Sequence, residues 1–193
     1  MTIVDATVKD GRRRRAHDSR QRIVAAMIEL VGEGHITPSA EDVAARATVG
    51  LRTVFRHFSD MESLYAALTA SLVEHYEMWL IPFESMDWRG QLAEIVERRT
   101  ATYERLLPFK RAGDAHRHMS PAIQAEHARM RDLLRQRLAA LLPATIRDDP
   151  ARFEMIDLML SLDVWQRLRD EQHLTPDTAR ALIRGEVMRV AAT

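Results

Sequence analysis

Residues 39–58 hold the side chains of this chain that are best suited to recognising another molecule. The run SAEDVAARATVGLRTVFRHF fits a short helix, a tight turn and a second short helix. Ser39 and Asp42 match a capping box at the start of the first helix, and Val54 and Phe58 share the inner face of the second. The side chains expected to point outward from the second helix are Arg52, Thr53, Arg56 and His57.

A helix that exposes cationic and hydroxyl side chains can lie in the major groove of double-stranded DNA. There arginine pairs with guanine edges, whereas hydroxyl groups and histidine reach phosphate. The pattern therefore predicts a helix-turn-helix DNA reader. We expect Arg52 to face base edges, Thr53 to face phosphate and Val49 to fill the angle between the two helices.

The same region resembles the TetR family of one-component transcriptional regulators. The run TVFRHF at 53–58, followed by SDMESL at 59–64, resembles the family's signature, and RIVAAMIEL at 22–30 resembles its first helix. The resemblance implies a homodimer that binds a palindromic DNA site and responds to a small-molecule effector. The residues that it implies in DNA contact are Ser39, Gly50, Arg52, Thr53, Phe55, Arg56 and His57.

Three positions depart from the family pattern. Thr48 stands where the turn usually has glycine, and a β-branched residue is disfavoured at positive φ. We expect a slightly remodelled turn, in which Gly50 either takes the special conformation or acts as a weak N-cap. Phe55 stands where tyrosine is common, and Met61 stands where a lysine often binds phosphate. Both changes predict a shallower salt dependence of DNA binding unless other cations compensate.

The segment before the first expected helix is rich in arginine, and we interpret residues 1–18 as a flexible basic arm. Such an arm either enters a minor groove or stays a solvated tail. Residues 1–58 contain ten Lys and Arg against seven Asp and Glu, while the whole chain is neutral. This polarised charge fits a small DNA reader joined to a domain that does not bind nucleic acid. The cations of the arm are Arg12, Arg13, Arg14 and Arg15.

The composition narrows the class of protein. A chain of 193 residues with 46% hydrophobic content can build one large or two small domains. Apolar runs fall well short of the roughly 20 residues needed to span a bilayer, so we expect a cytoplasmic protein with no membrane partner. The chain lacks cysteine, which excludes disulfides and thiolate sites. His116 and His118 face apart at i and i+2 on a helix, and we expect no metal and no cofactor.

Helical periodicity dominates the chain and predicts an all-α fold of about nine helices. We expect an N-terminal three-helix helix-turn-helix DNA-binding domain over residues 19–64. A C-terminal helical domain for effector binding and dimerisation would follow over residues 65–193. The first helix is expected to begin near Ser19, and Ser59 with Glu62 predict a capping box before the fourth.

Prolines divide the C-terminal domain. We expect a fifth helix from Trp88 to Leu107, ending before Pro108, and a short sixth over 109–118. Ser120 with Pro121 would open the next, and the eighth would run from about Pro150 to Glu171.

The expected eighth helix is apolar on two adjoining faces. One row holds Phe153 and Ile156, and a second holds Met155 and Met159. The width of this apolar surface favours a place in the dimer interface, although a central helix within one subunit would explain the width too. Two recognition helices about 34 Å apart would then match a palindromic site. The residues expected at the dimer interface are Leu162, Trp165, Ile183 and Val187.

The resemblance also implies an effector cavity among the fourth to eighth helices. Aromatic and methionine side chains at helical spacing are ordinarily core filler, so packing is the alternative role for each candidate. The candidates are Trp79, Phe83, Tyr103, His116, Met119, Met130 and Trp165.

A second class of function stays open, that of a helical enzyme or interaction protein whose helix-turn-helix is structural only. The sequence has no glycine-rich phosphate loop and no nucleophile elbow, which argues against an enzyme. The outward polar row of 52–57 suits a partner-helix groove poorly. The predicted function is a ligand-responsive DNA-binding regulator, in its simplest form a repressor released by its effector.

Overall fold

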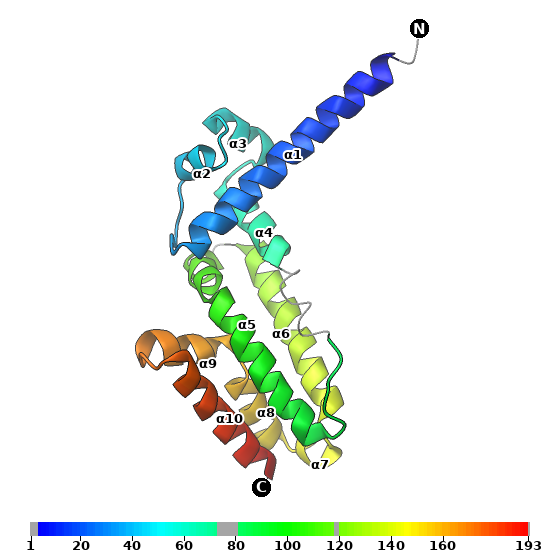
Figure 1. The fold of residues 1–193 in the computed structure, drawn as a ribbon, viewed down its shortest axis with the longest axis vertical. Coiled ribbons are helices and arrows are strands. Elements are labelled where there is room, and N and C mark those ends of the chain that lie inside the picture. The colour runs from blue at the N-terminus through cyan, green and yellow to red at the C-terminus, as the bar shows by residue number, and fades with distance from the viewer. Residues whose placement is uncertain (1–3, 73–80, 118–119, 193) are drawn as a thin grey trace. The chain divides into compact units, whose positions relative to one another are not determined.

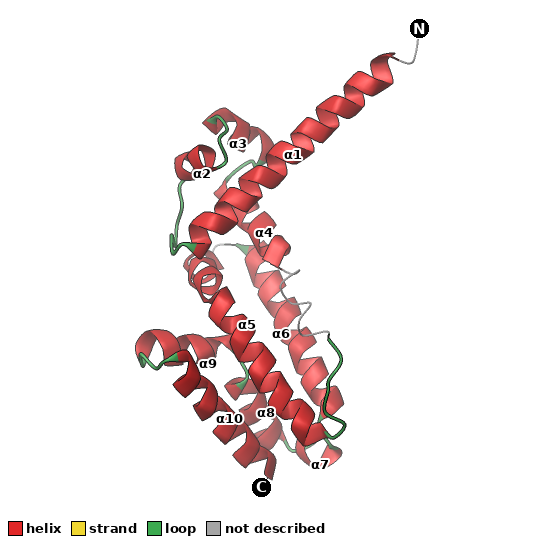
Figure 2. Ribbon diagram, viewed as in Figure 1, coloured by secondary structure: helices red, strands yellow, loops and turns green. Residues whose placement is uncertain are grey.

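The computed structural model describes the backbone of residues 4–72, 81–117 and 120–192, and their side chains except those of 4–16, Arg117 and Ala122. These described residues form ten α-helices and one π-helix, and no β-strand lies among them (Figure 1, Figure 2). The predicted all-α fold is confirmed.

The first helix, α1 (Val4–Gly32), begins well before the predicted start at Ser19. From residue 4 onward the structure therefore has helix where a flexible arm was expected. Arginine and alanine favour helix, and Gly11 alone lowers helix stability by only about 1 kcal/mol, so the polar stretch can continue the helix. The inner face is as predicted, because Ile23, Met27 and Leu30 are buried.

The helix-turn-helix consists of α2 (Ala40–Arg46) and α3 (Leu51–His57). The turn between them is a Schellman motif: the Val49 amide donates to the Ala44 carbonyl, and the Thr48 amide donates to the Ala45 carbonyl. Thr48 takes the left-handed conformation itself, with φ of 53°. Gly50 has φ of −72° and caps α3, so its expected special conformation is wrong and its role as a weak N-cap is confirmed.

Helix α4 (Met61–Leu72) begins one residue later than a cap at Ser59 would give. The Asp60 carboxylate accepts a hydrogen bond from the Ser63 amide at 2.7 Å, and the Ser63 hydroxyl lies 3.4 Å from the Asp60 amide. The predicted capping box of Ser59 and Glu62 is therefore wrong. The pair Ser59 and Glu62 and the pair Asp60 and Ser63 both have residue types and spacing suited to a cap. The structure uses the second pair, and the side chain of Ser59 donates to Asp60 instead.

The chain packs into two compact units. The first combines Met1–Leu72 with Pro108–Gln124, and the second combines Val73–Leu107 with Ala125–Thr193. The predicted domains divide at Leu64 and Tyr65, whereas this packing keeps all of α4 with the helix-turn-helix. The reason is that Tyr65, which directly follows the predicted boundary, is buried in the same hydrophobic cluster as α1 and α2.

Helix α5 (Trp88–Arg117) continues through Pro108, where the sequence predicted an end. An interior proline removes one hydrogen bond and costs about 3 kcal/mol. Packing after the proline favours continuation, because Ala112 is fully buried in the core of the first unit and Phe109 packs against it.

The remaining helices are α6 (Pro121–Leu141), α7 (Ala144–Arg147), α8 (Pro150–Met159), α9 (Leu162–Gln166), the π-helix Arg167–Glu171 and α10 (Pro176–Ala192). The single helix predicted from Pro150 to Glu171 is thus wrong. The chain breaks at Leu160, and the Ser161 hydroxyl starts a new helix by accepting a hydrogen bond from the Val164 amide at 3.2 Å.

Candidate nucleic-acid interface

Local hydrogen bonds fix the start of α2. The Ser39 hydroxyl accepts a hydrogen bond from the Asp42 amide at 3.1 Å, and the Asp42 carboxylate accepts one from the Ser39 amide at 2.9 Å. The predicted capping box is confirmed. The Ser39 hydroxyl also donates to the Asp42 carboxylate, at 2.7 Å, and this bond together with the one from the Ser39 amide lowers the pKa of Asp42 by stabilising its ionised form.

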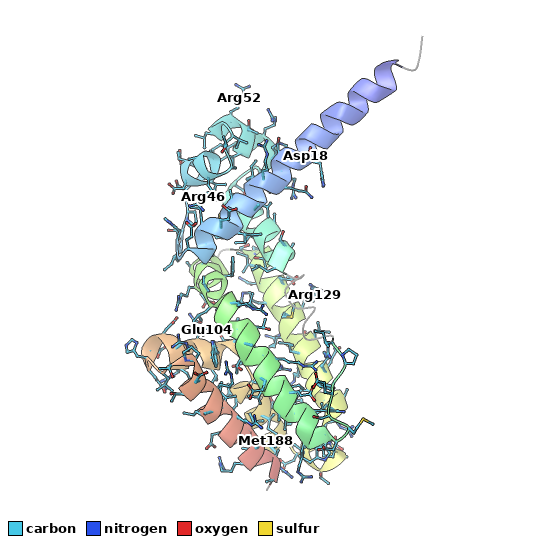
Figure 3. The ribbon with its side chains drawn as sticks, viewed as in Figure 1. Asp18, Arg46, Arg52, Glu104, Arg129 and Met188 are labelled. Carbon is cyan, nitrogen blue, oxygen red and sulfur yellow. The ribbon has the colours of Figure 1, made fainter. Side chains whose placement is uncertain are left out.

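An ion pair ties the other end of α2 to α1. The Arg46 guanidinium donates to both carboxylate oxygens of Glu33, at 2.7 and 2.9 Å, and reaches Glu29 at 3.4 Å. Hydrogen bonding from Arg46 lowers the pKa of Glu33. Figure 3 shows Arg46 between the two helices. Arg46 therefore positions the helix-turn-helix and is engaged within the protein.

The inner face of α3 holds it against the core of the first unit. Val54 and Phe58 are buried, as predicted, and Val49 of the turn packs against the same cluster. Because these residues fix the rotation of α3 about its axis, the opposite face is set toward solvent.

The outer face of α3 is exposed over two turns. Arg52 and Arg56 are exposed, and Figure 3 shows Arg52 projecting away from the helix. Leu51 and Phe55 are exposed as well, while Thr53 is half-buried. This seven-residue helix thus presents two guanidinium groups on one side, which suits contact with a polyanion.

His57, at the end of α3, is partly withdrawn from solvent. Its Nε2 atom is buried and has no hydrogen-bond partner among the described residues. Burial lowers the pKa of His57, and the nearby charges of Arg56 and Arg20 lower it further. His57 is therefore a weaker candidate for a charged phosphate contact in the free protein than its exposed neighbours.

Arg20 of α1 was missed by the sequence interpretation. It is exposed, and its guanidinium carbon lies 4.8 Å from the centre of the Phe58 ring. This cation–π contact holds a third guanidinium beside the end of α3. The sequence around Arg20 carries no motif that would have marked it, because the contact arises from packing between α1 and α3.

The other predicted DNA contacts stay predictions. Ser39 is exposed but its hydroxyl is engaged with Asp42, and Gly50 has open space around the position of a Cβ atom. The side chains of Arg12, Arg13, Arg14 and Arg15 lie outside those that the structure describes.

The described effector candidates are divided between the two units. Trp79 and Met119 lie outside the described residues. The His116 ring packs on the Tyr65 ring in the first unit, with centroids 4.0 Å apart. Phe83, in the second unit, lies under the Arg98 guanidinium, and Met130 is half-buried.

Tyr103 and Trp165 are engaged in a polar network inside the second unit. The Tyr103 hydroxyl donates to the Leu160 carbonyl at 2.7 Å, and the Trp165 indole N–H donates to Glu104 at 3.1 Å. Glu104 also accepts two hydrogen bonds from Arg169, both at 3.0 Å. These contacts tie α5 to the broken segment after α8, and they favour the packing alternative for both aromatic residues.

Three of the four predicted dimer residues are already buried within a single chain. Trp165 has no exposed surface, and Ile183 and Val187 are buried as well. A side chain that is already covered by its own subunit has little surface left for a partner, so burial favours packing within the subunit for these three residues, and the dimer interface stays a prediction. Leu162 is half-buried and keeps some exposed surface.

The described residues offer neither a metal-binding group nor a membrane-spanning helix. Within the described residues, no group of three or more His, Asp or Glu side chains could hold a metal ion. None of the helices in the described ranges is long and apolar enough to cross a membrane.

Several solved structures share this fold. A transcriptional regulator from Rhodococcus sp. RHA1 gives a TM-score of 0.67 at 16% identity, over 89% of this chain and 95% of its own. A TetR-family transcriptional regulator from Mesorhizobium loti gives 0.67 at 18% identity, over 92% and 97%. The multidrug-binding protein EbrR, complexed with imidazole, gives 0.57 at 22% identity, over 90% and 89%.

Comparisons of the sequence alone give no match to a family profile or to a curated protein. The solved structures nevertheless show that the chain has the fold of TetR-family transcriptional regulators. The resemblance noted in the sequence is confirmed at the level of the fold.

Proposed function

We propose that this chain, which has the fold of TetR-family transcriptional regulators, is a DNA-binding transcriptional regulator that reads the major groove with α3. The observation that carries this proposal is the outer face of α3, where Arg52 and Arg56 are exposed on a helix whose opposite face is locked into the core. A short helix held in this way can enter a groove about 12 Å wide without refolding.

The cations around α3 supply the attraction to DNA. Arg20, Arg52 and Arg56 are exposed, and, unlike Arg46, they form no ion pair with a carboxylate among the described side chains. Free guanidinium groups release counterions from DNA when they bind phosphate, which makes affinity fall with salt. The arginine segment at 12–15 would add to this attraction if it follows the minor groove.

A homodimer fits the surface of the second unit. Helices α8 and α10 pack against each other through buried side chains, and both leave large apolar side chains exposed. We place the seam on this outer surface, in place of the buried residues predicted from sequence. A dimer would present two recognition helices to a palindromic site. The exposed apolar residues of these helices are Met155, Leu158 and Leu182.

The proposed effector is a small molecule bound in the second unit. The support is the fold shared with EbrR, which is a multidrug-binding protein. Release of DNA on effector binding would make the protein a repressor. A transcriptional regulator acts where its DNA lies, and we propose a cytoplasmic location on this ground.

A salt titration of DNA binding tests the proposal. Fluorescence anisotropy of a labelled mixed-sequence duplex should show affinity that falls steeply with salt, by a slope of about −0.9 for each neutralised phosphate. The double variant Arg52→Gln, Arg56→Gln should flatten the slope by about one to two. Arg131→Gln removes an exposed cation of α6 and serves as the matched control, with no expected change. Absence of salt-dependent binding by the unaltered protein would refute the proposal and favour a structural helix-turn-helix.

A further inference from the structure

The outer face of α3 carries an apolar row beside its cationic row. Leu51 is 36% exposed and Phe55 is 49% exposed. These two residues are spaced i and i+4, as are Arg52 and Arg56, so each pair forms a row along the helix. Among the described side chains of the first unit, the only other large hydrophobic residue with comparable exposure is Ile36, in the loop before α2.

Leu51 and Phe55 do not contribute to the hydrophobic core, so their exposed apolar surface is available to a binding partner. Phe55 lies outside the hydrophobic cluster that buries Val54 and Phe58, and so does Leu51. Two side chains make too small a patch for a stable protein interface, which usually buries several hundred Å² on each partner. The neighbouring guanidinium row complements a polyanion, so double-stranded DNA is the occupant that this face fits.

DNA offers one apolar group in its major groove, the C5-methyl group of thymine. We infer that Phe55 and Leu51 contact thymine methyl groups and thereby select thymine at defined positions of the operator, while the arginine row reads guanine or phosphate beside them. This inference rests on the proposed function and adds its sequence preference. It also gives Phe55 a role that differs from the phosphate contact of a tyrosine hydroxyl, because a phenyl ring has no donor.

The spacing limits where these thymines lie. Side chains at i and i+4 are about 5–6 Å apart along a helix. Successive base pairs are about 3.4 Å apart. The two methyl groups are therefore expected within about two base-pair steps of each other in each half-site.

Removal of single methyl groups from the DNA tests the inference. Operators are first selected from random duplexes with the full-length protein, and each thymine is then replaced by deoxyuridine, which pairs identically but lacks the methyl group. Affinity for the unaltered protein should fall about fourfold at one or two neighbouring thymines per half-site. This is about 0.8 kcal/mol, the value of one buried methylene-sized group.

Protein variants then assign the contact. Phe55→Ala should abolish the loss at one thymine, so that the thymine and deoxyuridine duplexes bind equally, and Leu51→Ala should do so at the neighbouring thymine. Neither variant removes a cation, so the salt slope should stay unchanged. Ile36→Ala changes an equally exposed apolar side chain outside α3 and should keep the full discrimination. Circular dichroism melting checks that each variant is folded.

The outcomes separate this inference from the proposed function. Failure of the unaltered protein to bind any duplex would overturn both. Tight binding with no methyl-sensitive thymine, or selected operators without thymine in the half-site, would overturn the inference alone. Discrimination that persists in both Phe55→Ala and Leu51→Ala would assign the methyl contact to other residues and would also overturn it.

Discussion

Thr48→Gly should stabilise the protein. Thr48 is a β-branched residue at φ of 53°, in the position of the turn that glycine usually occupies. The left-handed conformation costs a non-glycine residue about 1–2 kcal/mol. Glycine gains about 0.4–1 kcal/mol of conformational freedom in the unfolded state, which offsets part of this. The expected net gain in the free energy of unfolding is about 1 kcal/mol.

Thermal melting followed by circular dichroism measures this gain. A change of about 1 kcal/mol raises the midpoint by roughly 2–4 °C if the chain unfolds as one unit. Glycine keeps the two turn hydrogen bonds, so the angle between α2 and α3 and the affinity for DNA should not change.

The reverse substitution, glycine to threonine, can be made in the turn that follows α1. Gly34 has φ of 101° and follows α1 in the same type of turn, in which the His35 amide donates to the Leu30 carbonyl. A Cβ atom at Gly34 would meet open space, so Gly34→Thr adds backbone strain without a clash. It should lower the midpoint by a similar amount. If Gly34→Thr destabilises while Thr48→Gly has no effect or lowers the midpoint, the strain assigned to Thr48 does not exist.

Three further substitutions test other parts of the structure. Ser39→Ala removes the N-cap of α2 and should lower the free energy of urea unfolding by about 1 kcal/mol, while an unchanged value would deny the capping role. His57 has a pKa below its ordinary value of 6.5, so the unfolded state binds more protons near this pH. Its contribution to stability should be full above pH 6.5 and should be lost as the pH falls through the lowered pKa. His57→Gln should remove that part of the pH dependence, and an identical profile for both proteins would show that His57 does not cause it. Leu158→Glu alters a side chain that is 54% exposed and should give a folded monomer by sedimentation, whereas the control Leu133→Glu on α6 should leave the dimer intact; a Leu158→Glu dimer would exclude this surface as the seam.

Local chemistry explains which elements could be predicted from sequence. The cap at Ser39 depends on a residue three positions away, and the cap at Ser120 likewise depends on a near neighbour. Periodicity located the inner faces of α1 and α3 because burial repeats with the helical turn. Helix α3 and its exposed arginines are therefore readable from the sequence alone.

Tertiary contacts decided the features that the sequence did not predict. The break after α8 frees the Leu160 carbonyl, which accepts hydrogen bonds from Arg99 and Tyr103 of α5. These partners lie 61 and 57 residues away in sequence, so no local pattern reveals them. A helix that is apolar on two faces also does not show which face is covered by its own subunit. For that reason Trp165 was assigned to a dimer seam although it is buried beside Glu104.

If the outer face of α3 reads DNA sequence, loss of one of its arginines must change which base pairs are preferred. The unaltered protein is therefore compared with Arg52→Ala on a selected operator and on its full set of single base-pair variants. A bidentate arginine contact to guanine is worth about 1–3 kcal/mol of discrimination, so Arg52→Ala should lose preference at one base pair per half-site and keep it elsewhere. An unchanged ranking of all the operator variants would show that Arg52 does not read a base pair.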